Sequence, residues 1–127
     1  MNEILYIVEI IDNGSKVSVI ATLTREDDHY IFTPYNLNPN SVSRFYPKVV
    51  IKSKGMPAMA ERRLYSKNRP DIKEILARYG LQSYDKWELL KRTRGRLLTD
   101  NIQYLTKEEL EILKESKNIF PLSVLRI

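Results

Sequence analysis

Cysteine is absent from the 127 residues, and histidine occurs once, at position 29. Without cysteine the chain can form neither a disulfide nor a thiolate zinc site, and we expect a reducing, cytoplasmic setting. A transition-metal site with a single histidine would need several carboxylates close together, and the sequence scatters them. His29 starts an alternating apolar stretch, which favours a turn or edge residue over a general base. No cofactor is expected.

Glycine is also scarce, with four residues at positions 14, 55, 80 and 95. Each fits a turn or a helix end, and neither a glycine-rich phosphate loop nor a G-x-S-x-G motif occurs. No apolar run approaches the length needed to cross a bilayer. The first residues lack the basic start and the small-residue cleavage site of a signal peptide. We therefore expect a protein that is not an enzyme and has no membrane partner.

The first third of the chain carries a clear β-strand pattern. Residues 3–11 are apolar on both faces and rich in β-branched side chains, which is typical of a strand with neighbours on both sides. Residues 16–24 alternate, with Ile20 predicted to point mostly outward, and residues 29–35 form a third alternating run. The turn Asp12-Asn13-Gly14 tolerates positive φ and favours a hairpin. The pattern predicts a three-stranded antiparallel meander.

Two helices are predicted in the middle of the chain. Pro70 suits a first helical position, and Gly80 supplies the left-handed residue that ends a helix. Asp85 with Glu88 three residues later resembles a capping box, and Gly95 is the expected end of the second helix. The connection is short, so we expect an antiparallel or angled helical pair.

The remaining elements are short. Residues 49–51 predict a strand, and residues 97–98 and 102–105 predict extended pieces. Thr106 and Glu109 form a capping box that starts a helix over 107–116. The apolar tail, 120–127, is expected to dock as a last strand or extended segment.

Strands first and helices after indicate an α+β fold, with an N-terminal antiparallel β-meander followed by short helices. The length fits a single domain, 1–127, with a β-rich half at 1–55 and a mainly helical half at 56–127.

Positive charge is concentrated in the middle of the chain. Residues 1–43 hold two Lys/Arg against six Asp/Glu, residues 44–96 hold fifteen against five, and residues 97–127 hold four against five. Such a distribution can mark a surface for an acidic partner, either protein or nucleic acid. The candidate binding residues are Arg62, Arg63, Lys67, Arg69, Lys73, Arg78, Lys91, Arg92, Arg94 and Arg96.

Three aromatic residues, Tyr65, Tyr79 and Trp87, are interleaved with these cations. Basic and aromatic side chains together would suit a surface that tracks a nucleic-acid backbone and stacks on its bases. The alternative is a solvated face of two amphipathic helices, with Tyr79 and Trp87 in the core. Arg92, Arg94 and Arg96 alternate around Gly95, so they could converge at the end of the predicted helix, where the helix dipole alone would also favour cations.

The stretch LYIVEIIDNGSKVSVIATLTREDDHYIFTPY resembles the opening of HipA-type toxin kinases and of the small stand-alone HipS-type protein of three-gene HipBST systems. In that family a strand, a turn and a VG-x-L strand precede an aromatic Y-x-F-x-Y strand. Here residues 19–23 and 30–35 stand in those places. The ATP-binding and catalytic parts of the kinase body have no counterpart, so the resemblance implies a non-catalytic module that binds a partner protein.

A later run is similar to a segment that precedes the HIRAN domain in some bacterial proteins. Its matching residues are Arg69-Pro70-Asp71, Gly80-Leu81, Leu89-Leu90, Thr93, Gly95 and Thr99-Asp100, with Arg94 where that segment often has glycine.

Three functions remain open from the sequence. The first is a protein-binding regulator of the HipS kind, whose partner would be a kinase-like toxin. The second is a phage or mobile-element inhibitor of a host nucleic-acid-targeting defence enzyme. The third is a nucleic-acid-binding accessory protein that uses the basic residues of 44–96.

Overall fold

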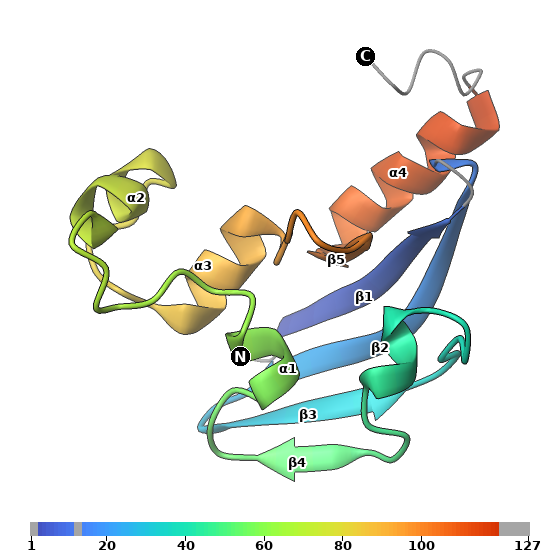
Figure 1. Ribbon diagram of the computed structural model, residues 1–127, viewed down its shortest axis with the longest axis horizontal. Helices are drawn as coiled ribbons and strands as arrows, with labels where there is room; N and C mark the ends of the chain where they lie inside the picture. Colours follow the sequence, from blue (N-terminus) through green and yellow to red (C-terminus); the bar gives the residue numbers. More distant parts are fainter. Residues whose placement is uncertain (1–2, 12–13, 120–127) are drawn as a thin grey trace.

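The computed structural model describes residues 3–11 and 14–119 as a five-stranded antiparallel sheet with short helices around it (Figure 1). The strands β1 (Glu3–Ile11), β2 (Lys16–Glu26) and β3 (His29–Pro34) form the predicted meander. Two short strands, β4 (Ile51–Ser53) and β5 (Ile102–Leu105), flank it, giving the order β4-β3-β2-β1-β5. The predicted α+β fold with an N-terminal meander is confirmed.

The pairing of β1 with β2 contains a β-bulge. Ile7 pairs with Ala21, whereas the next residue, Val8, pairs with Val19, so Ile20 is the extra residue of β2. A bulge places two successive side chains on the same face of the sheet. Ile20 and Ala21 are accordingly both fully buried in one core. The outward orientation predicted for Ile20 was wrong, because strict alternation holds only without a bulge.

Each face of the sheet has its own apolar core. The smaller core joins Val8 and Leu105 to Leu110 of α4 (Lys107–Ile119). The larger core lies on the other face, under α1 (Ala58–Glu61), α3 (Lys86–Thr93) and the 3-10 turn η2 (Val42–Phe45). It contains Leu5, Ile7, Ile20, Ala21, Leu23, Phe32, Tyr46, Met56, Ala60, Trp87, Leu90, Ile102 and Tyr104. Trp87 is therefore a core residue.

The helix ends follow the local sequence signals. The helix α2 (Ile72–Arg78) ends at Gly80, whose φ is 74°, and the Leu81 N–H donates to the Leu76 carbonyl at 2.8 Å. This is the hydrogen bond of a Schellman stop. The Asp85 side chain accepts from the Glu88 N–H at 3.0 Å and caps α3. Both predicted ends are confirmed, although α2 starts two residues after Pro70.

The start of α4 forms a reciprocal capping box. The Thr106 N–H donates to the Glu109 carboxylate at 2.9 Å, and the Glu109 N–H donates to the Thr106 hydroxyl at 3.2 Å. Two helical N–H groups are thus paired by two side chains. The predicted helix is confirmed and runs to Ile119.

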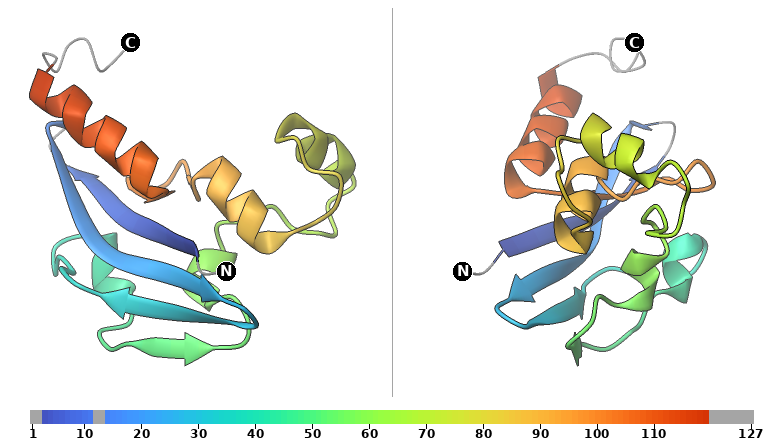
Figure 2. Two further views of the ribbon diagram at one scale, coloured as in Figure 1. Left: turned by 180° about the vertical axis from the view of Figure 1, so that it is seen from behind. Right: turned by 90° about the vertical axis from the view of Figure 1, so that its left-hand side faces the viewer.

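Two short predictions shifted along the chain. The strand expected at 49–51 lies at Ile51–Ser53, and Leu97-Leu98 lies in an exposed turn and not in an extended piece. The predicted turn residues 12–13 and the tail 120–127 lie outside the described residues. In both Figure 1 and Figure 2, α2 lies at the end of the molecule away from the sheet, with α3 between them.

Candidate functional site

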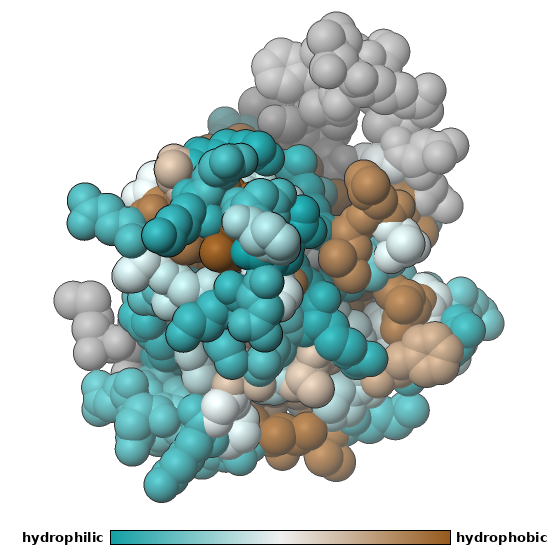
Figure 3. Space-filling view, turned by 60° about the vertical axis from the view of Figure 1, so that its left-hand side comes forward, coloured by the Kyte–Doolittle hydropathy of each residue, from teal (hydrophilic) through white to brown (hydrophobic). Residues whose placement is uncertain are grey.

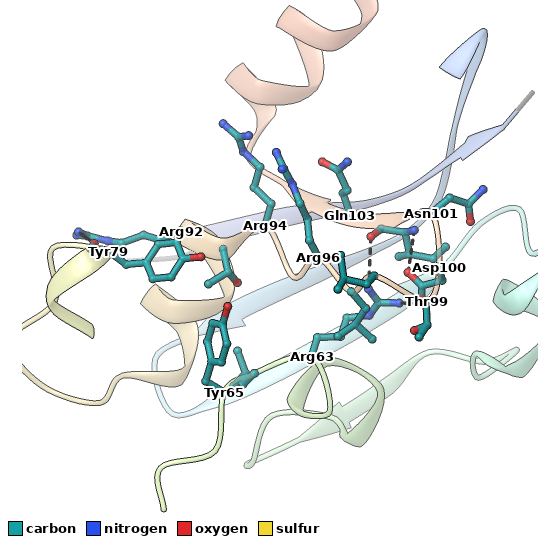
Figure 4. Close-up of a pocket in the computed structure, with 15 residues that line it drawn as sticks. Arg63, Tyr65, Tyr79, Arg92, Arg94, Arg96, Thr99, Asp100, Asn101 and Gln103 are labelled. Carbon is teal, nitrogen blue, oxygen red and sulfur yellow. Dashed lines mark hydrogen bonds and ion pairs between the residues drawn. The ribbon is translucent and has the colours of Figure 1, made fainter. Parts of the chain in front are cut away.

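A hollow of about 890 Å³ opens where α3 ends, between the helical pair and the loop that leads into β5 (Figure 4). Its wall is made by residues 63–65, by Tyr79, and by the stretch from Arg92 to Gln103, which runs from the end of α3 to β5. The lining residues are Arg63, Leu64, Tyr65, Tyr79, Arg92, Thr93, Arg94, Arg96, Leu97, Leu98, Thr99, Asp100, Asn101, Ile102 and Gln103.

Arg63 forms the floor of this hollow and is buried, with 7% of its surface exposed. Its guanidinium donates to the Gly95 carbonyl at 2.7 Å and to the Asp100 carboxylate, and it lies 5.5 Å from the centre of the Tyr104 ring. Asp100 also accepts from the Ile102 N–H at 3.1 Å. Arg63 and Asp100 together therefore tie the loop 95–102 to the core.

At the end of α3 the backbone turns into the loop that lines the hollow. Arg94 and Gly95 are both left-handed, each with φ of 58°. The Gly95 N–H donates to the Leu90 carbonyl at 3.1 Å, and the Arg94 carbonyl accepts from the Tyr104 N–H at 2.8 Å. A Cβ on Gly95 would lie 3.0 Å from the Tyr104 ring, so glycine is required there for packing as well as for φ.

The three arginines at this helix end differ in how far they are already engaged. Arg92 donates to the Tyr79 carbonyl at 2.8 Å and so caps α2, and it contacts the Glu88 carboxylate at 3.4 Å. Arg94 donates through Nε to Glu109 at 2.7 Å. Arg96 is exposed, and its side chain makes no hydrogen bond or ion pair with residues 3–11 or 14–119. Arg96 is therefore the cation most available to a ligand.

Two tyrosines close the side of the hollow opposite Arg94 and Arg96. The ring centres of Tyr65 and Tyr79 lie 6.5 Å apart, and Figure 4 shows their hydroxyls pointing toward one another. Burial, followed by the hydrogen bond and charge of Tyr65, raises the pKa of Tyr79 above its usual value. Both rings offer hydroxyl groups that can donate hydrogen bonds beside the arginines.

The other predicted cations are distributed over several surfaces. Arg62 and Lys67 line a neighbouring hollow of about 560 Å³, next to Tyr84. Arg69 pairs with the exposed Asp71 at 2.9 Å.

The last three lie on the two helices outside the hollow. Lys73 and Arg78 are exposed on α2. Lys91 contacts Glu3 and Glu88, each at 3.0 Å, and it is the first cause of the lowered pKa of Glu3. Of the ten predicted residues, the structure brings Arg63, Arg92, Arg94 and Arg96 to one hollow, with Arg63 buried in its floor.

Sequence reasoning missed the apolar rim of the hollow. Leu97 is 37% exposed and the Leu98 side chain is fully exposed, beside the polar residues Thr99, Asn101 and Gln103. Figure 3 shows exposed apolar side chains gathered beside a mostly hydrophilic region on the side that carries α2. The signal was the placement of two leucines directly after Arg96, a stretch that was predicted only to be an extended piece.

The hollow offers cations, hydroxyls and an apolar rim, so it can bind an anionic group that carries an apolar side chain next to it. Within residues 3–11 and 14–119 no three His, Asp or Glu side chains are close enough together to hold a metal ion. In the same part of the chain, none of the helices has both the length and the apolar character required to span a membrane. Comparison of the chain with family models, with curated proteins and with solved structures found no match.

Proposed function

We propose that the chain is a non-catalytic regulator that binds an acidic partner protein in the hollow at the end of α3. This function is the one that the resemblance to the HipS-type module implies. The observation that carries it is that an exposed arginine, Arg96, and a fully exposed apolar side chain, Leu98, line the same hollow. Interfaces between proteins are enriched in arginine and in apolar anchors that become buried on binding.

The charges of the hollow define the partner's chemistry. Arg96 has no internal partner among the described residues, and Arg94 uses its Nε for Glu109, so terminal nitrogens of both can meet a carboxylate. Arginine binds carboxylates through two parallel hydrogen bonds, which adds orientation to charge. The partner should therefore present Asp or Glu next to a bulky apolar side chain that covers Leu98.

A second candidate function is binding of single-stranded nucleic acid. The Tyr65–Tyr79 pair beside Arg94 and Arg96 favours it, because bases stack on aromatic rings while arginines follow the phosphates. A fully exposed leucine on the rim favours the protein partner, since phosphates and base edges gain little from an aliphatic side chain.

The experiment uses the tagged full chain, an extract of the source cell treated with nuclease, and three variants. Leu98→Asp and Arg96→Gln change the proposed contacts, and Arg78→Gln removes the same charge on α2, outside the hollow. We expect one acidic protein to be retained by the wild type and by Arg78→Gln but not by the other two. With that protein purified, Leu98→Asp should raise Kd about tenfold or more, because one buried leucine side chain is lost.

Retention that is equal for all variants would contradict the proposal. Loss of all binding on nuclease treatment, with a steep fall of affinity as salt is added, would favour the nucleic-acid function instead.

A further inference from the structure

A second surface, on the other edge of the sheet, has the features of a peptide-binding site. β4 pairs with β3 on one side, and within the described residues no strand lies on its other side (Figure 1). Large apolar side chains are exposed just before it: Phe45 at 70%, Val49 at 67% and Val50 at 61%. An edge strand with exposed apolar residues readily pairs with another extended chain.

An apolar hollow of about 500 Å³ lies beside this edge. Ile51 and Ser53 of β4 line it, and because strand side chains alternate, Lys52 between them points to the opposite face. The other lining residues are Phe45, Pro47, Gly55, Met56, Pro57, Ala58, Met59 and Arg62. Flexible methionines suit a groove that adapts to an apolar side chain of a ligand.

The charge around this edge is positive. Lys48, Lys52 and Lys54 are exposed, and none of their side chains makes a hydrogen bond or ion pair with the described residues. Arg62, whose Nε donates to the Ala58 carbonyl at 3.3 Å, adds a fourth cation at the rim. Asp28 interacts electrostatically with Lys52, but its carboxylate also contacts the His29 ring at 2.9 Å. The edge is therefore complementary to an acidic chain.

We propose that β4 accepts an extended acidic segment of a partner protein as a sixth strand of the sheet. Backbone hydrogen bonds along the free edge hold the segment, and side-chain pockets select its sequence. Alternate side chains of the segment are apolar and enter the hollow beside Ile51. The intervening side chains are Asp or Glu and lie next to Lys52, as cross-strand neighbours of opposite charge.

Two other occupants fit the edge less well. In a second copy of this chain, paired through the same edge, the lysines of the two β4 strands would face one another, and like charges across strands are destabilising. The chain's own segment 120–127 has the sequence FPLSVLRI, which contains Arg126 and no acidic residue. Charge thus favours a separate acidic partner. The proposal is independent of the hollow at α3, because the two hollows share no lining residue.

The test is selection of a displayed library of random twelve-residue peptides on the immobilised full chain. We expect enrichment of peptides with alternating apolar and acidic residues over at least four positions. The best peptide should bind Lys52→Glu about tenfold more weakly, since an attractive pair becomes a repulsive one. Lys73→Glu, the same reversal on an exposed site of α2, should bind the peptide as the wild type does.

A second measurement follows the backbone. Bound peptide should slow hydrogen exchange in residues 51–53, while Leu98→Asp should leave peptide affinity unchanged. The proposal is overturned if no peptide is enriched, if the enriched peptides lack the alternation, or if Lys52→Glu binds them as the wild type does. It is also overturned if only a single-stranded oligonucleotide binds this edge in a Lys52-dependent way, which would make the occupant a nucleic acid.

Discussion

Replacing Arg63 by methionine should lower the free energy of unfolding far more than the same replacement of the adjacent Arg62. Arg63→Met keeps the aliphatic stem and removes the guanidinium that binds the Gly95 carbonyl and Asp100. The Asp100 side chain is 9% exposed, so its carboxylate would remain buried without a counter-charge. Breaking a buried ion pair in this way costs about 3–5 kcal/mol. That is a large share of the roughly 5–15 kcal/mol that a domain has in total.

The assay is urea unfolding followed by tryptophan fluorescence, since Trp87 is the one tryptophan of the chain and is 1% exposed in the core. Arg62→Met is the matched control. Arg62 is adjacent in sequence but exposed, so its replacement should change stability by no more than about 0.5 kcal/mol.

The double variant Arg63→Met/Asp100→Asn separates the cost of the unpaired Asp100 charge from the other effects of losing the guanidinium. Because the amide is neutral, its burial costs less than that of an unpaired carboxylate, and the double variant should be more stable than Arg63→Met alone. A loss below about 1 kcal/mol for Arg63→Met would refute the structural role assigned to this residue. So would a double variant whose losses simply add, since contacting residues are expected to couple.

Three further perturbations have defined outcomes. Arg94→Gly relieves the strain of a left-handed backbone at a non-glycine residue, which costs about 1–2 kcal/mol. It also removes the half-buried ion pair with Glu109, which is expected to contribute about 0–1 kcal/mol. The midpoint of urea unfolding should therefore stay equal or move to higher urea concentration, while partner binding weakens. Burial and the neighbouring Tyr46 raise the pKa of Tyr104 above its usual 10.0. Its contribution to stability is therefore complete below pH 10.0 and is lost as pH rises through the folded pKa. In a pH titration, the ultraviolet absorbance of the Tyr104 tyrosinate should appear at a higher pH in the folded protein, together with alkaline unfolding, than in the unfolded chain. The hydrogen bond from Lys91 is the largest cause that lowers the pKa of Glu3 below 4.5. Glu3 therefore contributes stability above pH 4.5, and this contribution is lost as the pH falls through the folded pKa. In acid-unfolding curves, Glu3→Gln should make the loss of stability with falling pH less steep.

Local signals predicted the parts of the fold that depend on neighbouring residues. The meander followed from alternation and a hairpin turn, and the ends of α2, α3 and α4 followed from Gly80, Asp85 and Thr106. Each of these helix ends is decided by contacts between residues no more than five positions apart. Capping and turn chemistry therefore transfers directly from sequence to structure.

Contacts between distant residues were not predictable in the same way. β5 pairs with β1 almost the whole chain away, and the bulge at Ile20 depends on that sheet and its twist. Arg62 and Arg63 look alike in sequence, yet the one is exposed and the other is buried against Gly95 and Asp100. Nothing local distinguishes two successive arginines, because their environments are made by residues more than thirty positions later.

The candidate site shows why a count of cations overstates a binding surface. An arginine that already bonds to the protein must give up those bonds, at least in part, before it can serve a ligand. If Arg63 turned to a ligand, the loop that shapes the hollow would lose its tie to the core, and if Arg92 did so, α2 would lose its cap. Arg94 would lose one half-buried ion pair with Glu109. The Arg96 side chain has no bond to another described residue to give up, so a partner that binds it gains the full charge-assisted hydrogen bond. Affinity for the partner should therefore depend most on Arg96 and next on Arg94. The number of bonds that each arginine already makes within the protein sets this order, since all four arginines carry the same charge.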